Sequence, residues 1–226
     1  MTHYDAVLFD QDGVLVEPPA ADVQAAATRA AFRDVGVANP SENHVDAVVN
    51  GLTVDRLYEI CRAYDLDPEA FWAARERLDE RSQFERFEAD ARTTYDDLEA
   101  TGALDVPRGV VSNNHDSTVA FVLEYFDLRP LFDAAYGREK TIESLRLKKP
   151  NPHYLDLGLD ALDADDALYV GDGESDVLAA HRAGVDSALL RRSHNADLDP
   201  DPAPNYVVDT LHEVATIVDE AGRSGE

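Results

Sequence analysis

The sequence predicts an α/β fold, a doubly wound parallel sheet that carries an inserted α-helical domain. Three observations point to it. Short apolar segments recur along the chain and alternate with helical stretches in its second half. The stretch between the first apolar segment and Arg108 has helical periodicity and no convincing strand. A length of 226 residues is enough for a large core and a smaller domain.

Six strands are expected, because a buried parallel strand has a near-continuous apolar sequence. They are Ala6–Asp10, Arg108–Ser112, Ala134–Tyr136, Ala167–Gly171, Ser187–Leu190 and Tyr206–Val208. Helices are predicted between the later strands and after the last one: Thr118–Phe126, Pro152–Leu162, Ser175–Ala183 and Thr210–Glu220. Gly184 lies where a helix carboxyl cap belongs. This alternation indicates a parallel sheet with helices on both faces.

Residues 17–89 are expected to form a separate α-helical cap over the strand ends, since a helical insertion of this size exceeds a simple crossover. Its helices are predicted over Asp22–Val35, over Thr53–Tyr64, and from the Asp67-Pro68 pair onward, because Asp before Pro is a typical helix start. Residues 1–16 and 90–226 then form the sheet-containing core. Ser193–Asn205, rich in Asp and Pro, is predicted to be a loop.

Acidic residues dominate the charge: 46 Asp and Glu against 20 Lys and Arg give a formal net charge of −26. The acids are spread among periodic apolar residues, which argues against a disordered acidic tail. Such a charge makes the compact state repel itself, and high salt screens that repulsion. The pattern is typical of proteins from a halophilic cytoplasm. It disfavours nucleic acid as a partner.

Membrane and secretory roles are not expected. No apolar run approaches the roughly 20 residues that span a bilayer, and the first residues lead into a strand without a signal peptide. The single cysteine, Cys61, excludes an internal disulfide and a cysteine-built zinc site. We therefore expect a cytoplasmic protein with no membrane partner. The oligomeric state stays open.

The first strand ends in two carboxylates, Asp10 and Asp12, followed by Gly13. Open α/β sheets bind their ligands just past the carboxyl ends of the strands. Two anions so close together repel each other, and burying them without a partner is costly. A divalent cation is the ordinary remedy, and oxygen ligands favour magnesium. The alternative is a plain surface turn, which Asp and Gly also form.

Three later segments place polar groups where a phosphate and magnesium site needs them. Ser112 ends a strand, and its hydroxyl and the backbone amides after it suit a phosphoryl oxygen. Lys149 is one of only three lysines, and the proline after it fixes the backbone. Asp172 ends a fourth strand, and Asp176 lies at the start of the next helix. Each segment taken singly also has an ordinary explanation. The segment after Ser112 could be a plain loop, Lys149 could belong to a solvated basic pair, and the acids at the helix start could simply favour the helix dipole.

Together, these strand ends resemble the four signature motifs of the haloacid dehalogenase-like hydrolase superfamily: Asp10 with Asp12, Ser112, Lys149, and Asp172 with Asp176. Over nearly the whole chain the sequence is similar to the phosphoglycolate-phosphatase-like branch, with a Rossmann-like core and a helical cap after the first strand. Two departures lie outside the core chemistry. Glu17 stands where many relatives carry Asp, and the spacing over Glu139–Leu147 is unusual.

The resemblance implies a magnesium-dependent phosphatase acting on a small phosphorylated metabolite. Asp10 would attack phosphorus and form an aspartyl-phosphate. Asp12 would protonate the leaving oxygen and then deprotonate the hydrolytic water. Ser112 and Lys149 would hold the phosphoryl oxygens, and Asn113 would add a backbone amide.

The resemblance also implies the metal ligands. Magnesium would be held by an Asp10 oxygen, the Asp12 main-chain carbonyl, Asp172 and waters, with Asp176 orienting a water or Lys149. In the cap, Arg56 is a candidate contact for the substrate anion, although a surface ion pair is its ordinary role.

Other activities on the same core fit the sequence less well or stay open. Asp12 disfavours dehalogenation, because a leaving halide needs no proton. Residues 17–89 contain no lysine for a Schiff base, which disfavours phosphonate cleavage. A sugar phosphomutase on the same core stays open. So does a catalytically silent phosphate-binding or regulatory protein, because fold does not fix function.

Overall fold

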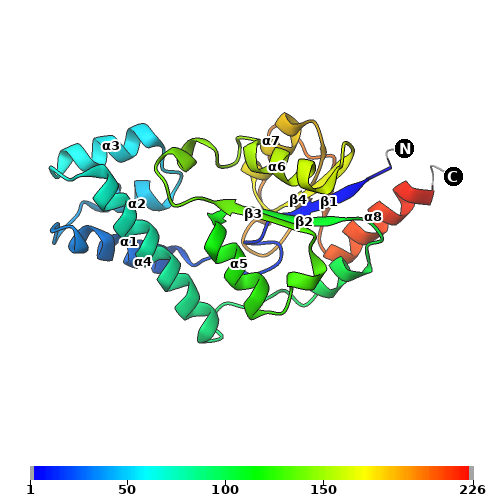
Figure 1. Ribbon diagram of the computed structural model, residues 1–226, viewed down its shortest axis with the longest axis horizontal. Helices are drawn as coiled ribbons and strands as arrows, with labels where there is room; N and C mark the ends of the chain where they lie inside the picture. Colours follow the sequence, from blue (N-terminus) through cyan, green and yellow to red (C-terminus); the bar gives the residue numbers. More distant parts are fainter. Residues whose placement is uncertain (1–2, 224–226) are drawn as a thin grey trace. The chain divides into compact units, whose positions relative to one another are not determined.

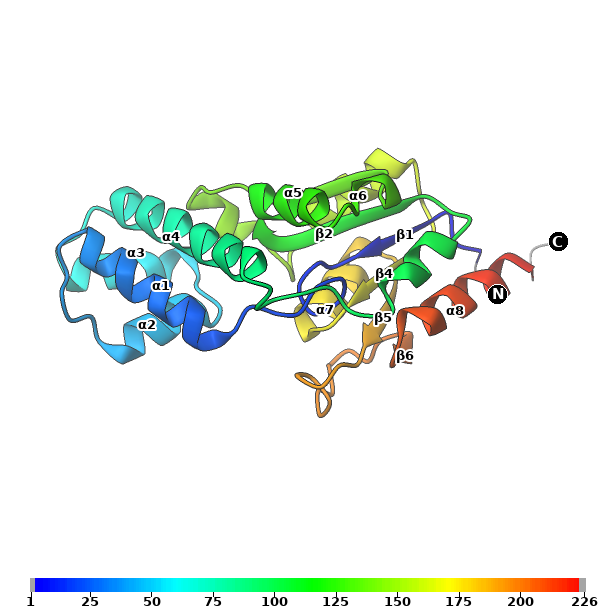
Figure 2. The same cartoon turned by 90° about the horizontal axis from the view of Figure 1, so that it is seen from below.

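Six strands form one fully parallel sheet in the computed structural model, which describes residues 3–223. The strands are β1 (Ala6–Phe9), β2 (Arg108–His115), β3 (Ala134–Arg138), β4 (Ala167–Gly171), β5 (Asp186–Leu190) and β6 (Tyr206–Val208). Their order across the sheet is β3-β2-β1-β4-β5-β6, so β1 lies between β2 and β4. Figure 2 shows β2, β1, β4, β5 and β6 in this succession. The predicted α/β fold with a parallel sheet is confirmed.

Helices cover both faces of this sheet. They are α5 (Asp116–Tyr125), α6 (His153–Leu162), α7 (Glu174–Ala183) and α8 (Leu211–Arg223), with short 3-10 turns η1 (Leu98–Ala103) and η2 (Arg129–Leu131). Figure 1 shows α6 and α7 on one face and α5 and α8 on the other. Side chains of β1 alternate between the faces, as a strand requires. Leu8 reaches α6 at Gly158, where a Cβ would lie 3.2 Å from its methyl group.

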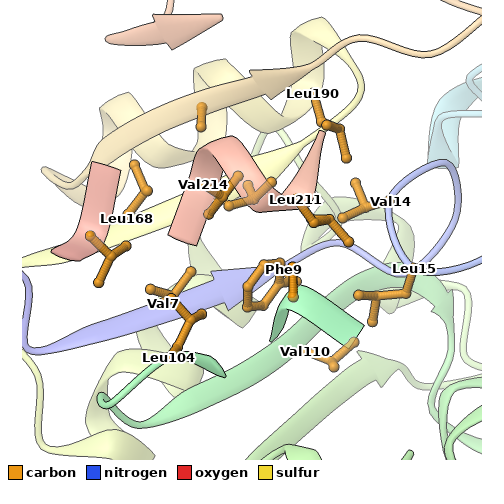
Figure 3. Close-up of a cluster of buried hydrophobic side chains, with 14 of the residues drawn as sticks. Val7, Phe9, Val14, Leu15, Leu104, Val110, Leu168, Leu190, Leu211 and Val214 are labelled. Atoms are coloured by element: carbon orange, nitrogen blue, oxygen red, sulfur yellow. The ribbon is translucent and has the colours of Figure 1, made fainter. Parts of the chain in front are cut away.

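The opposite side of β1 supplies the main hydrophobic core. Val7 and Phe9 are fully buried there with Val110 of β2 and with Leu211 and Val214 of α8. Figure 3 shows these side chains gathered around Phe9. Burial of this kind stabilises a chain by about 25 cal/mol per Å² of apolar surface. The strand that carries Asp10 is therefore held rigidly on both faces.

A second compact unit comprises residues 18–92 and 139–147. Its helices are α1 (Ala21–Asp34), α2 (Glu42–Val49), α3 (Val54–Ala63), α4 (Pro68–Glu88) and the 3-10 turn η3 (Glu143–Arg146). Asp67 caps α4 by accepting a hydrogen bond from the Ala70 amide at 3.3 Å, and Pro68 occupies the first turn, as the sequence predicts. This helical unit has its own hydrophobic core, built around Phe32, Leu57, Ile60 and Phe71.

The boundaries of the helical unit differ from those we assigned from the sequence. It begins at residue 18 and ends at 92 rather than spanning 17–89, and it includes residues 139–147, which we had placed in the sheet-containing core. The reason is hydrophobic packing. Ile142 and Leu145 are buried in the core of the helical unit. Within residues 3–223 no helix is long and apolar enough to cross a membrane.

β2 also extends three residues beyond the predicted end at Ser112, as far as His115. The pairing with β3 shifts register between Val111 and His115, and His115 then pairs with Arg138. The sequence does not predict this extension of β2, because Asn113 and Asn114 are poor strand formers. Ser112 is therefore held inside the sheet and is 2 % exposed.

Candidate active site

Asp10 is fixed at the end of β1 by the neighbouring strand. Its amide donates to the Val170 carbonyl of β4 at 2.8 Å, so the sheet pairing continues one residue past Phe9. The Gln11 amide donates to Asp10 Oδ1 at 2.7 Å. The residue is 8 % exposed. The carboxylate is thus presented at the carboxyl edge of the sheet in a single orientation.

The turn after Asp10 depends on Gly13. This residue has φ +81°, a conformation that favours glycine, and its amide donates to the Val16 carbonyl at 2.7 Å. A Cβ at this position would lie 1.9 Å from Asp172 Oδ2. Gly13 therefore lets the first acidic segment approach the strand end that carries Asp172.

Three carboxylates meet at this edge of the sheet. Asp10, Asp172 and Asp176 each offer a ligand atom, and these atoms lie within 4.8 Å of one another. One cation, the Lys149 ammonium, lies 3.0 Å from Asp10 Oδ2 and 2.7 Å from Asp176 Oδ1. We call these four residues the carboxylate cluster. Counted as ionised groups, its three acids and one ammonium leave a formal surplus of two negative charges.

The surplus is visible in the ionisation of Asp10. Burial, reinforced by the carboxylates of Asp176, Asp172 and Asp12, raises the pKa of Asp10 to about 8, although Lys149 lowers it. Burial also raises the pKa of Asp172, against the opposing hydrogen bond from His194. Two neighbouring acids with raised pKa values are what an uncompensated set of buried carboxylates produces.

These oxygen donors fit a divalent cation. Carboxylate oxygens are the ligands that magnesium prefers, and an added double positive charge would balance the two surplus negative charges of the cluster. Asp176 is already heavily engaged: its Oδ2 accepts from the Gly173 amide at 2.9 Å and from the Asp172 amide at 3.2 Å. Asp10 and Asp172 therefore have more capacity left for a metal than Asp176.

Lys149 is buried and held by its main chain as well as its side chain. Its amide donates to Asn113 Oδ1 at 2.7 Å, and Asn113 Nδ2 donates to the Lys149 carbonyl at 3.2 Å. The sequence predicts only a backbone amide contact from Asn113. Its side chain instead forms this reciprocal pair, which ties the end of β2 to Lys149.

The Lys149 ammonium has more oxygen neighbours than protons. Besides the two carboxylates, Tyr169 Oη lies at 2.6 Å and the Val111 carbonyl at 3.3 Å. Burial disfavours the ammonium, but Asp10 and Asp176 outweigh it and raise the pKa of Lys149. Lys149 is therefore charged at any working pH. A substrate oxygen must share or displace one of its present partners.

Two side-chain amides hold the Asp12 carboxylate. Its Oδ1 accepts from Gln11 Nε2 at 3.1 Å and its Oδ2 from Asn114 Nδ2 at 2.9 Å. Ser112 Oγ accepts from the Asn114 amide at 3.2 Å, so Asn114 contacts two predicted site residues. Sequence analysis gave Asn114 no role, since an Asn after a strand is an ordinary loop residue.

Two further residues that the sequence did not single out contact Asp172. His194 Nε2 lies 2.6 Å from Asp172 Oδ2, and Asn195 Nδ2 donates to the Asp172 carbonyl at 2.7 Å. Arg56 is not among the residues gathered in the sheet-containing unit. It lies on α3 of the helical unit, where Nη1 pairs with Glu59 at 2.9 Å.

Comparison with known proteins gives one consistent result. The family described as haloacid dehalogenase-like hydrolase matches residues 7–190. A phosphoglycolate phosphatase from Cereibacter sphaeroides is 30 % identical over 192 residues, covering 83 % of this chain and 85 % of its own. One from Vibrio cholerae is 29 % identical over 225 residues, covering 94 % and 96 %. The solved structure of CbbY from Rhodobacter sphaeroides, in complex with phosphate, has a similar fold, with TM-score 0.69 and 20 % identity over 93 % of this chain and 96 % of that one.

Proposed function

This chain belongs to the haloacid dehalogenase-like hydrolases and is a phosphatase, and we propose that it hydrolyses a small phosphorylated metabolite with magnesium through an aspartyl-phosphate on Asp10. The observation that carries the proposal is the carboxylate cluster. Its surplus negative charge calls for a divalent cation at the same place where Asp10 is held in one orientation.

Asp10 acts as the nucleophile in the proposed reaction. One of its oxygens forms a bond to phosphorus while the bond from phosphorus to the leaving oxygen breaks, and Asp12 gives that oxygen a proton. A water then attacks the aspartyl-phosphate, Asp12 takes a proton from it, and Asp10 and inorganic phosphate are released. Covalent capture divides one difficult displacement into two easier ones. The side-chain amides of Gln11 and Asn114 support this role of Asp12, because they donate hydrogen bonds that fix its carboxylate.

Magnesium would be held by Asp10, by Asp172 and by the Asp12 main-chain carbonyl. When bound, it would neutralise charge on the phosphoryl group and on the cluster. Ser112 and Lys149, with the Asn113 amide, would hold the other phosphoryl oxygens, on which charge gathers in a loose transition state. Asp176 would act by keeping Lys149 in place, which its 2.7 Å ion pair supports.

The substrate we propose is a small phosphorylated carboxylic acid. The curated relatives that the chain matches over most of its length are phosphoglycolate phosphatases. In this proposal the helical unit acts as a cap that closes over the site and excludes bulk water, and Arg56 contacts the substrate carboxylate. The phosphomutase alternative differs in how the cap treats the aspartyl-phosphate, because water must be kept from that intermediate.

The decisive experiment measures phosphate release from a panel of phosphorylated acids, sugars and para-nitrophenyl phosphate, with magnesium and at high potassium chloride. The proposal expects turnover of phosphoglycolate and related acids, loss of turnover in EDTA, and a higher KM for Arg56→Ala. Isomerisation of a sugar phosphate without phosphate release favours the phosphomutase. Phosphate binding without turnover across several divalent metals favours a silent binding protein.

We also propose that the protein works in a salt-rich cytoplasm. Support comes from the net charge of −26 and from a single cysteine, Cys61, which is buried. At 1 M salt the Debye length is only about 3 Å, so repulsion between surface acids is largely screened. Thermal unfolding should therefore shift to higher temperature as potassium chloride is raised. A midpoint that does not depend on salt would contradict the halophilic part of the proposal.

A further inference from the structure

The loop after β5 contacts Asp172 from outside the carboxylate cluster. We propose that His194 and Asn195 are positioning residues that fix the Asp172 carboxylate for a divalent cation, and that they thereby set the magnesium affinity of this protein. The inference rests on the proposed function, which places magnesium at Asp172.

His194 acts on the Asp172 side chain. Its Nε2 lies 2.6 Å from Asp172 Oδ2, a distance at which an Nε2–H group donates a short hydrogen bond to a carboxylate. A carboxylate can turn about its bond to Cβ, and a hydrogen bond to one oxygen limits that rotation. The Gly13 backbone flanks the same oxygen, since a Cβ there would lie 1.9 Å from Oδ2. Asp172 Oδ2 thus lies between a hydrogen bond and a close backbone, which restricts the direction of the other oxygen.

Asn195 acts on the main chain of Asp172. Its Nδ2 donates to the Asp172 carbonyl at 2.7 Å and to the Leu190 carbonyl at 2.9 Å, while its Oδ1 accepts from the Arg192 amide at 2.6 Å. Both kinds of polar atom on this side chain are therefore engaged. Through Asn195 the segment that carries Asp172 is tied to the end of β5.

The loop has the internal bonds needed to hold these positions. Arg191 Nη1 donates to the Ala196 carbonyl at 2.8 Å. Arg192 forms two hydrogen bonds to the Asp97 carboxylate, at 2.8 and 3.0 Å, and its guanidinium lies 4.0 Å from the centre of the Tyr95 ring. These contacts fix both ends of the short segment that carries His194 and Asn195. Outer hydrogen bonds of this kind to metal-ligating groups typically change metal affinity by about 10–100-fold.

The test measures magnesium binding to the metal-free full chain by calorimetry, at high potassium chloride. His194→Leu removes the donor, and His194→Gln keeps an amide donor of similar reach. His181→Leu, at an exposed position on α7, is the matched control. We expect the magnesium Kd to rise about 10–100-fold in His194→Leu and in Asn195→Ala. It should stay close to wild type in His194→Gln and in His181→Leu.

A second readout separates positioning from general damage. In His194→Leu, the magnesium concentration for half-maximal turnover should rise with the Kd, while kcat at saturating magnesium and the unfolding temperature of the metal-free protein stay near wild type. Unchanged or tighter magnesium binding by His194→Leu overturns the inference, because His194 would then be idle or would compete with the metal. Failure of the wild-type protein to bind magnesium overturns the metal site of the proposed function, and this inference with it.

Discussion

Two regions of this molecule bury charged side chains, and they balance them differently. The carboxylate cluster holds three acids against the single ammonium of Lys149. A second buried set lies along α4 of the helical unit and just after it, and we call it the α4 cluster. Its members are Arg75, Glu76, Asp79, Gln83 and Arg92, all at most 9 % exposed.

The α4 cluster forms a continuous chain of contacts. Arg75 pairs with Glu76 at 2.8 Å and with Asp79 at 3.6 Å. Gln83 then joins Asp79 to Arg92, with both hydrogen bonds at 3.0 Å. Among these members, two formal positive charges match two formal negative charges. The carboxylate cluster differs in having a formal surplus of one sign, which a bound cation would offset.

The largest expected effect comes from a substitution in the carboxylate cluster. Asp10→Asn should lower turnover by about 10⁴-fold or more, because the reaction loses its nucleophile. The same substitution should raise the unfolding temperature of the metal-free protein at pH 7, because Asp10 has a raised pKa and the uncompensated cluster loses one acid. Phosphate release and thermal unfolding in EDTA measure the two effects. The exposed Asp46→Asn is the control, and full turnover in Asp10→Asn would exclude the nucleophile assignment.

A substitution in the α4 cluster should lower the stability of the protein instead of raising it. Arg75→Met should lower the free energy of unfolding by about 3–5 kcal/mol, because Glu76 and Asp79 each lose an ion pair in a buried place. Arg77→Met on the same helix is the matched control. Its pair with Asp34 is exposed and should contribute at most about 1 kcal/mol. Urea unfolding at constant potassium chloride measures both, and equal losses would remove the distinction between the two kinds of charge set.

The ion pair between Asp97 and Arg192, in the sheet-containing unit, should make the stability of the protein depend on pH. Burial raises the pKa of Asp97, but hydrogen bonds from Arg192 and the Leu211 amide outweigh it and lower the pKa below its usual range. The stability from this pair is therefore fully present above about pH 4 and is lost as the pH falls through the lowered pKa. Asp97→Asn should cost about 2 kcal/mol at pH 7, and the difference from wild type should shrink below pH 4. A difference in unfolding free energy that stays constant in acid would contradict this account.

The smallest effect concerns Tyr169, a neutral side chain that contacts the carboxylate cluster through Lys149. Tyr169→Phe removes a hydroxyl that contacts Lys149 at 2.6 Å and donates to the Val111 carbonyl at 2.9 Å. We expect kcat to fall about fivefold with little change in KM, the loss that one hydrogen bond to a positioning group would give. Tyr125→Phe, on the surface of α5, is the control. A change confined to KM would mean that Tyr169 acts on substrate binding instead.

Much of this arrangement could be predicted from the sequence, because its signals are local. An apolar run that ends in a carboxylate identifies both a strand and its polar end, as at Asp10 and Asp172. Parallel strands bring such ends to one edge of a sheet, so the meeting of these two residues followed from the fold. Lys149 stood out because lysine is so rare in this chain.

The remaining contacts could not be predicted, because they depend on packing between distant segments. Tyr169 is indistinguishable from any other residue of a buried strand until its hydroxyl is seen beside Lys149. His194 and Asn195 lie in a segment whose Asp and Pro content indicates only a loop. Residues 139–147 carry too few apolar positions for the sequence alone to assign Ile142 and Leu145 to the helical core.

The nine-residue segment 139–147, which belongs to the helical unit, affects how that unit folds during synthesis and how it can be transplanted. The polypeptide passes between its two units four times, after residues 17, 92, 138 and 147. A ribosome must therefore synthesise most of the chain before the helical unit can complete its own interior. An engineer who transplants residues 18–92 into a foreign scaffold would leave behind Ile142 and Leu145, and with them two pieces of the interior that the transplant needs.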